Sequence, residues 1–272
     1  MTLVEKNTSL GWLLYQYLRL RLSWRFHNVV IRGLQHLQNL PHDRPVIAFS
    51  NHINWWDGLM VFLLTRCVRH KNFYCIMSDE QIAQYPYLKR LGAFSIDLEN
   101  PLRAAGVVRF AVRLLQKRST LLWLFPQGEM SSPHQPLQLR TGANYLATQA
   151  NGAQMLPVAF RYEFFHGDKP HALIEIGQPF SAHESSDEKI AISCLEVSQR
   201  LNDAVVSQNL EGFEEIIRPK QSAVQSFRNL WAGLSRLFPK RKLRAIVAKP
   251  ESPATHSSDG SVAVEEEHAT MR

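Results

Sequence analysis

The amino-acid sequence predicts an α/β fold, a single domain with a mixed sheet flanked by helices and with amphipathic segments at both ends of the chain. Short apolar runs alternate with helix-like segments over residues 45–210, as in a sheet covered by helices. Aromatic, aliphatic and basic residues are concentrated before this region, and a basic amphipathic segment follows it. We therefore divide the 272 residues into four predicted regions: 1–40, an N-terminal amphipathic helical region; 41–215, the α/β domain; 216–249, a basic amphipathic segment; and 250–272, a disordered tail.

The N-terminal region predicts a helix over Leu10–Val30 in which Trp and Tyr alternate with aliphatic residues. Arg19, Arg21 and Arg25 interrupt the apolar run, which never reaches the roughly 20 residues that a membrane-spanning helix needs. Aromatic rings beside Arg suit the headgroup boundary of a bilayer. We expect a peripheral or monotopic membrane protein, and an ordinary helix packed on the domain is the alternative.

The elements of the domain follow from apolar periodicity and end signals. The long helix over 101–117 begins with Pro101 and ends with Lys117 and Arg118, as helix termini prefer. Ser185 or Ser186 is a plausible cap for the last helix. The predicted strands are 45–50, 73–77, 93–96, 120–125, 155–161 and 172–176, and the predicted helices are 56–68, 80–90 with a break at Pro86, 101–117, 141–150 and 187–208.

Charge and cysteine usage narrow the class of partner. The chain carries 31 basic and 24 acidic residues, a net charge of +7, which favours an anionic partner. Residues 218–249 contain nine basic residues and no acidic one, as in a helix that binds an anionic membrane surface. A docked helix and a nucleic-acid tail are the alternatives, but no nucleic-acid motif is present, so no nucleic acid is expected. Cys67, Cys75 and Cys194 are dispersed, which predicts reduced thiols on the cytoplasmic face and no metal site.

The loop from Asn51 to Gly58 carries the strongest candidate for catalysis. His52 follows a predicted buried strand, and a helix begins a few residues later, so the loop lies at the sheet edge where open α/β sheets bind ligands. His52 is suited to take a proton near neutral pH, and Asp57 can fix its tautomer from across the turn. A helix-capping Asp57 and an ordinary loop histidine are the alternatives.

A second candidate lies where the apolar strand over 120–125 runs into Pro126, Gln127, Gly128 and Glu129. Gly128 permits a close approach of the backbone to a ligand, and its amide could face a developing oxyanion. A plain turn at the end of a strand is the alternative.

Together these segments resemble the glycerolipid acyltransferase family, of which the lysophosphatidic acid acyltransferases are typical. The resemblance covers residues 45–180. His52 and Asp57 match the catalytic His-x4-Asp, and three further blocks follow in the family's order. The resemblance implies that His52 and Asp57 are catalytic and that the substrate-binding residues are Asn51, Gly92, Phe94, Asp97, Phe125, Pro126, Gln127, Gly128, Glu129, Arg140 and Pro157.

The resemblance also implies the reaction. His52, oriented by Asp57, takes a proton from an acceptor hydroxyl, which attacks the thioester of acyl-CoA or acyl carrier protein. The thioester is a co-substrate, so no resident cofactor and no metal is expected. The partners implied are the acyl thioester donor, a lipid acceptor and the membrane.

Two departures from the family pattern concern the acceptor. Leu98 and Met130 occupy positions where the family usually has Arg, and Arg is the natural clamp for a phosphate. Arg103, Arg140 and Lys89 are candidates to compensate. We expect a neutral acceptor hydroxyl, as on a glycolipid sugar, a carotenoid glycoside or another lysolipid. The alternatives are acylation of 1-acyl-glycerol-3-phosphate in phospholipid synthesis and a catalytically silent membrane-binding homologue.

Overall fold

A computed structural model of the chain describes residues 6–68, 72–133, 135–165 and 167–218. All of them belong to one compact unit, Met1–Ser226. The predicted basic segment 216–249 is described only as far as Arg218, and the predicted tail 250–272 lies outside the described residues.

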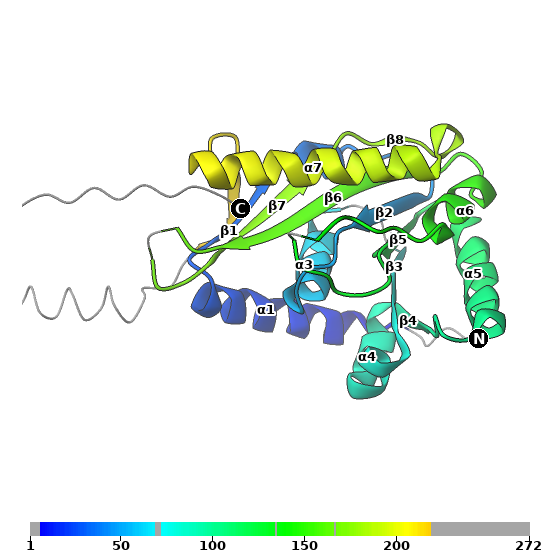
Figure 1. The fold of residues 1–272 in the computed structure, drawn as a ribbon. Helices are drawn as coiled ribbons and strands as arrows, with labels where there is room; N and C mark the ends of the chain where they lie inside the picture. Colours follow the sequence, from blue (N-terminus) through cyan, green and yellow to red (C-terminus); the bar gives the residue numbers. More distant parts are fainter. Residues whose placement is uncertain (1–5, 69–71, 134, 166, 219–272) are drawn as a thin grey trace, which may run out of the picture. The chain divides into compact units, whose positions relative to one another are not determined.

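The described residues form one mixed sheet of nine strands, which confirms the predicted α/β class (Figure 1). The strand order is β4-β3-β5-β2-β6-β7-β1-β9, and β8 pairs with β6. The pairs from β4 through to β6 are parallel, whereas β6 and β7 are antiparallel. The strands are β1 (Val29–Arg32), β2 (Val46–Ser50), β3 (Asn72–Ser78), β4 (Ala93–Ile96), β5 (Thr120–Leu124), β6 (Gln154–Glu163), β7 (His171–Ile176), β8 (Phe180–Ser181) and β9 (Glu214–Ile217).

Three strands, β1, β8 and β9, lie where the sequence predicts none. The N-terminal helix, predicted to extend to Val30, ends at Arg25, and β1 follows it. β1 pairs in parallel with β7 and antiparallel with β9. Part of the predicted N-terminal region 1–40 therefore contributes a strand to the same sheet as residues of the predicted domain.

The helices begin and end close to the predicted positions. Asn100 caps α5 by accepting from the backbone N–H of Arg103, and Ser186 caps α7 in the same way through Lys189. The predicted segment 80–90 divides at Pro86 into α4 and a short 3-10 helix, η2. The helices are α1 (Thr8–Arg25), α2 (Leu34–Gln38), α3 (Trp56–Leu64), α4 (Asp79–Gln84), η2 (Pro86–Leu91), α5 (Pro101–Leu115), α6 (Gly142–Gln149) and α7 (Asp187–Ser207), with single 3-10 turns η1 (Thr65–Cys67) and η3 (Ala182–Glu184).

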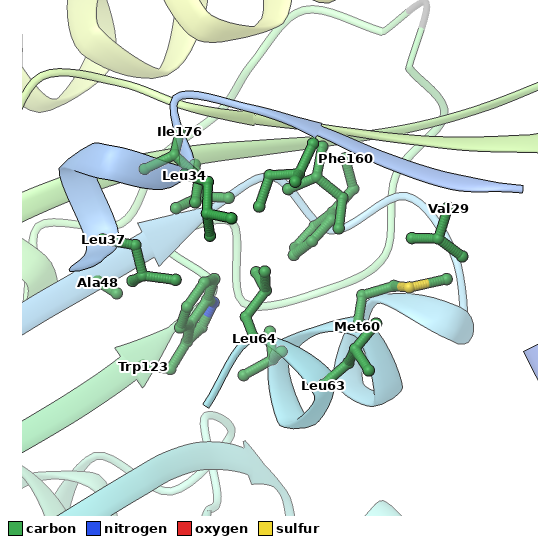
Figure 2. Close-up of a cluster of buried hydrophobic side chains, with 14 of the residues drawn as sticks. Val29, Leu34, Leu37, Ala48, Met60, Leu63, Leu64, Trp123, Phe160 and Ile176 are labelled. Carbon is green, nitrogen blue, oxygen red and sulfur yellow. The ribbon is translucent and has the colours of Figure 1, made fainter. Parts of the chain in front are cut away.

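The sheet buries side chains on both faces, because successive residues of a strand point to opposite sides. In β5, Trp123 packs in the cluster that also holds α3, whereas Leu122 packs with α5 and α6. Figure 2 shows Trp123 beside Leu37 and Leu64 in the first cluster. The fully buried indole N–H of Trp123 donates to the hydroxyl oxygen of Ser50 at 3.0 Å. This bond satisfies a polar group that would otherwise be costly to bury, and it ties β5 to the end of β2.

The segments that follow four parallel strands lie at one edge of the sheet. β2, β3, β4 and β5 run parallel, so their carboxyl ends meet at the same edge, which is where open α/β sheets bind ligands. His52 follows β2, Asp79 begins α4 after β3, Leu98 follows β4, and Phe125 follows β5.

The first helix, α1, has two different faces. Leu18 and Leu22 are buried. The exposed side chains Leu13, Tyr17, Leu20 and Trp24 recur every three or four residues, so they share the opposite face of the helix. Among the helices that the structure describes, none has the length and apolar character needed to span a bilayer.

Candidate active site

The structure brings His52 and Asp57 into direct contact. Nδ1 of His52 lies 2.9 Å from Oδ2 of Asp57. Oδ2 of Asp57 also accepts from the backbone N–H groups of Ile53 and Asn54, at 2.7 and 2.8 Å. An ionised carboxylate can only accept hydrogen bonds, so beside an ionised Asp57 it is Nδ1 of His52 that donates, and Nε2 is left to accept a proton. This is the geometry of a general base with its orienting carboxylate.

The carboxylate of Asp57 contacts the His52 loop rather than capping α3. Asp57 lies in the first turn of that helix, but its carboxylate points back to the loop amides of Ile53 and Asn54. Its second oxygen, Oδ1, accepts from the hydroxyl group of Tyr162 at 2.7 Å. Asp57 is completely buried, whereas His52 is 9% exposed, so only the histidine has access to a ligand.

The loop after β5 holds the His52 loop in place. The side-chain oxygen of Gln127 accepts from the backbone N–H of His52 at 2.6 Å, and its amide nitrogen donates to the hydroxyl oxygen of Ser131. The backbone N–H of Ser131 in turn donates to the carbonyl oxygen of His52 at 2.9 Å. The ring of Phe125 stacks on the imidazole with centroids 4.2 Å apart. These contacts fix the backbone and the ring plane of His52.

Two cavities meet at His52. The larger has a volume of about 430 Å³ and is lined by residues that follow β2, β3, β4 and β5. The smaller, of about 80 Å³, is almost entirely apolar and runs between α1, α3 and η2. The residues that line both cavities are His52, Trp55, Met77, Gln81, Tyr85 and Phe125.

The predicted site residues divide into two groups. Phe125, Pro126, Gly128, Glu129 and Arg140 line the larger cavity together with His52. The remaining predicted residues do not line either cavity that meets at His52: Asn51, Asp57, Gly92, Phe94, Asp97, Gln127 and Pro157.

Several residues of the second group have structural contacts instead. The amide of Asn51 bonds to both the N–H and the C=O of Phe160, at 2.8 and 2.9 Å. Phe94 is buried against Phe110. Asp97 accepts from the backbone N–H groups of residues 99 and 100, just before α5.

Gly92 and Pro157 also lie in the framework of the fold. Gly92 ends η2 with a φ of 107°. Pro157 is paired with Phe49 between β6 and β2, and its carbonyl oxygen accepts from the N–H of Gly177.

The amide of Gly128 is already occupied. It donates to the carbonyl oxygen of Phe125 at 3.0 Å, which closes a turn. The predicted role of this N–H as an oxyanion donor therefore has no support in this geometry. Gly128 instead leaves space for the side chain of Arg140, whose Nε atom would lie 2.6 Å from an added Cβ.

The charged side chains that line the larger cavity are Glu80, Glu129 and Arg140. Of the three cations proposed to compensate for Leu98 and Met130, only Arg140 is among the lining residues. Arg103 lies 3.6 Å from Asp97 with its side chain 72% exposed, and Lys89 is exposed on η2.

Sequence reasoning missed the lining residues of α4, among them Glu80, Gln81 and Gln84. Their position directly after a parallel strand is a signal that could have identified them. Tyr162 was also missed.

The described cysteines do not have the character of nucleophiles. Burial raises the pKa of the Cys75 and Cys194 thiols to about 12 in each case. Burial also raises the pKa of Cys67. Because the thiolate is the reactive form, these side chains are poor candidates for covalent catalysis.

Comparisons with known proteins give one family match and one similar solved structure. The family model described as Acyltransferase matches residues 31–161, a segment that contains His52, Asp57 and the loop after β5. The crystal structure of the 1-acyl-sn-glycerophosphate (LPA) acyltransferase PlsC from Thermotoga maritima has a similar fold, with a TM-score of 0.53 and 21% sequence identity. The match covers 72% of this chain and 80% of that chain. The family match and the similar fold support the resemblance of this chain to the glycerolipid acyltransferases.

Proposed function

We propose that the protein transfers a fatty acyl group from an acyl thioester to a hydroxyl group of a lipid acceptor, with His52 as the general base. The observation that carries this proposal is the 2.9 Å contact between Nδ1 of His52 and Oδ2 of Asp57, at the point where two cavities meet. The match to the Acyltransferase family model supports acyl transfer in general.

In the proposed reaction, Nε2 of His52 takes the proton of the acceptor hydroxyl as its oxygen attacks the thioester carbonyl carbon. Asp57 stabilises the imidazolium that forms. The tetrahedral intermediate collapses, the carbon–sulfur bond breaks, and His52 returns the proton to the departing thiolate. The products are an ester and a free thiol. A thioester is already activated, so this route needs no covalent enzyme intermediate.

The apolar cavity supports a fatty acyl group on the donor. Side chains such as Leu14, Leu59, Phe62 and Leu88 line it, and apolar walls favour a hydrocarbon chain. We propose acyl-CoA or acyl carrier protein as the donor, a co-substrate in a reaction without a resident cofactor.

The larger cavity supports a neutral acceptor. A phosphate monoester is normally bound by cations, of which Arg is the best suited. Here one guanidinium, that of Arg140, lines the cavity together with the carboxylates of Glu80 and Glu129. Carboxylate and amide oxygens accept hydrogen bonds from hydroxyl groups. We therefore propose a polyhydroxylated or otherwise uncharged headgroup, such as that of a glycolipid, a carotenoid glycoside or a neutral lysolipid.

The exposed face of α1 supports action at a membrane surface. Tyr17 and Trp24 lie on this face with Leu13 and Leu20, and Leu14 of the same helix lines the apolar cavity. A helix with this pattern can lie in the interface of a bilayer. We propose that the protein binds the cytoplasmic face of a membrane in this way, next to the entrance for the acyl chain.

An acceptor panel tests the reaction. Purified protein is given one acyl-CoA or one acyl carrier protein thioester, with lysophosphatidate, a monoacyl glycolipid, a carotenoid glycoside or a neutral lysolipid as acceptor. We expect faster acylation of a neutral acceptor than of lysophosphatidate. Faster acylation of lysophosphatidate than of every neutral acceptor would contradict the acceptor class. No transfer to any acceptor would favour a silent homologue.

A variant of His52, the proposed general base, tests the mechanism in the same assay. We expect His52→Ala to lower kcat by about 10²- to 10⁴-fold, the usual contribution of a general base. His183→Ala, at an exposed histidine outside both cavities, is the control and is expected to keep wild-type kcat. Wild-type rates in His52→Ala would contradict the assignment of the base.

A further inference from the structure

Asp57 depends on a residue outside its own loop. Three of the four hydrogen bonds to its carboxylate, those with His52, Ile53 and Asn54, converge on Oδ2. The fourth, donated by the hydroxyl group of Tyr162 at 2.7 Å, is the only hydrogen bond that Oδ1 accepts from the described residues. An ionised carboxylate without exposure to water needs each oxygen bonded, because an unpartnered buried charge is costly. No Lys or Arg of the described residues forms an ion pair with Asp57.

The protonation state of Tyr162 decides which group donates in its hydrogen bond with Asp57. Burial raises the pKa of Tyr162 well above its ordinary value, and the neighbouring carboxylate of Asp57 raises it further. The hydroxyl therefore keeps its proton and donates to Oδ1. A bond from a neutral donor to a charged acceptor is among the stronger hydrogen bonds in proteins.

Tyr162 is itself held rigidly. It lies in β6, two residues after Phe160, whose backbone N–H and C=O are both bonded to the side chain of Asn51. Its ring packs on Phe26 with centroids 5.7 Å apart, and Phe26 meets Trp56 edge-on at 5.1 Å. Asn51 thus anchors β6 next to the catalytic loop, and the aromatic contacts fix where the hydroxyl of Tyr162 points.

Tyr162 does not line either cavity that meets at His52. Any effect on the reaction must therefore pass through Asp57 rather than through contact with a substrate. We infer that Tyr162 is a positioning residue: it fixes the second carboxylate oxygen of Asp57 and thereby holds the imidazole of His52 with Nδ1 protonated and Nε2 available to the acceptor. The expected effect on kcat rests on the proposed function, whereas the expected effect on the His52 tautomer does not.

The first test is kinetic. Tyr162→Phe removes the hydroxyl group and keeps the ring that packs on Phe26. We expect kcat to fall roughly tenfold, in keeping with the loss of a hydrogen bond to a charged group, while the KM values for donor and acceptor stay at wild-type levels. Tyr74→Phe is the matched control, because Tyr74 is a buried tyrosine of β3 that lies outside the Asp57 network. It is expected to keep wild-type kcat.

The second test does not need activity. Full-length protein labelled with ¹⁵N-histidine reports the tautomer of each ring by NMR, and His52 is assigned by the loss of its signals in His52→Gln. We expect the Nδ1–H tautomer in the wild type and in Tyr74→Phe, and a mixture of tautomers in Tyr162→Phe.

The outcomes separate this inference from the proposed function. If Tyr162→Phe keeps kcat within about twofold of wild type and keeps the His52 tautomer, Tyr162 is a packing residue and the inference is wrong. A lowered thermal stability with an unchanged tautomer would lead to the same conclusion. If the wild type transfers no acyl group, the proposed function fails, and the tautomer measurement still decides the role of Tyr162.

Discussion

Gly128 stands where a turn and a close contact both exclude a side chain. Its φ of 79° is in the left-handed region, and an added Cβ would lie 2.6 Å from Nε of Arg140 and 3.0 Å from Cδ1 of Leu98. Because Arg140 lines the larger cavity, displacement of its side chain would alter the proposed acceptor site. The glycine therefore shapes the cavity without contributing a side chain or a free amide.

We expect Gly128→Ala to raise KM for the acceptor and to lower the free energy of unfolding by more than the ~1 kcal/mol that left-handed backbone costs an L-residue. Gly152→Ala is the control, because Gly152 has a φ of 69° but no atom within 4 Å of an added Cβ. Urea unfolding and acceptor kinetics measure both variants. Equal losses of stability, with no change in KM for Gly128→Ala, would contradict the role given to the contact with Arg140.

Local sequence was sufficient to predict the contact between His52 and Asp57, because only five positions separate them and their bonds lie within one turn of the chain. The contact of Tyr162 could not be predicted in this way. It joins residues 105 positions apart and depends on the register of β6 beside β2. Nothing in the sequence around Tyr162 distinguishes it from other strand tyrosines.

At the scale of elements, the periodic helices and the apolar strands of residues 46–207, except the two-residue strand β8, were predictable because each carries its signal locally. β1 was missed because Val29–Arg32 directly follows a helix of similar aliphatic composition. β9 was missed because it is a short edge strand whose first residues, Glu214 and Glu215, are exposed. Both strands are specified by pairing across the sheet rather than by their own pattern.

The exposed face of α1 gives a prediction for membrane binding. We expect Leu13→Glu/Leu20→Glu to weaken sedimentation with vesicles that contain phosphatidylglycerol, because the substitutions place charges on the apolar face. The measurement is made at high salt, where attraction between basic segments and lipid headgroups is screened.

A matched control lies on α7. Ile192 and Leu195 are 46% and 54% exposed, compared with 60% and 48% for Leu13 and Leu20. Ile192→Glu/Leu195→Glu is therefore expected to leave sedimentation unchanged. If the α1 variant still sediments as the wild type does, this helix is not the membrane contact.

At the scale of the whole molecule, a pair of histidines makes stability depend on pH. The rings of His27 and His171 lie 4.4 Å apart where β1 begins beside β7. Burial, and then the neighbouring His27, lower the pKa of His171 to about 4 from an ordinary value of 6.5. Between these values the unfolded chain binds a proton that the folded chain does not.

The free energy of unfolding is therefore expected to fall as the pH is lowered from about 6.5 towards 4, since the unfolded state binds more protons in this window. His171→Phe keeps an aromatic ring next to Phe165, whose ring lies 4.8 Å away, and is expected to flatten this decline. Chemical denaturation at a series of pH values measures the slope. His183→Phe, at an exposed position, is the control and is expected to keep the wild-type slope. A wild-type slope in His171→Phe as well would contradict the prediction.

The four loops at the sheet edge have unequal connections to one another. The loops after β2 and β5 are joined through Gln127, Ser131 and His52. By contrast, within the part of the chain that the structure describes, the side chains of Glu80, Gln81 and Gln84 on α4 form no hydrogen bond with either loop, although they line the same cavity. We therefore expect substitutions on α4 to change which acceptor headgroup the protein prefers without changing proton transfer at His52. The α4 side of the cavity is the place to begin a redesign of the alcohol that is esterified.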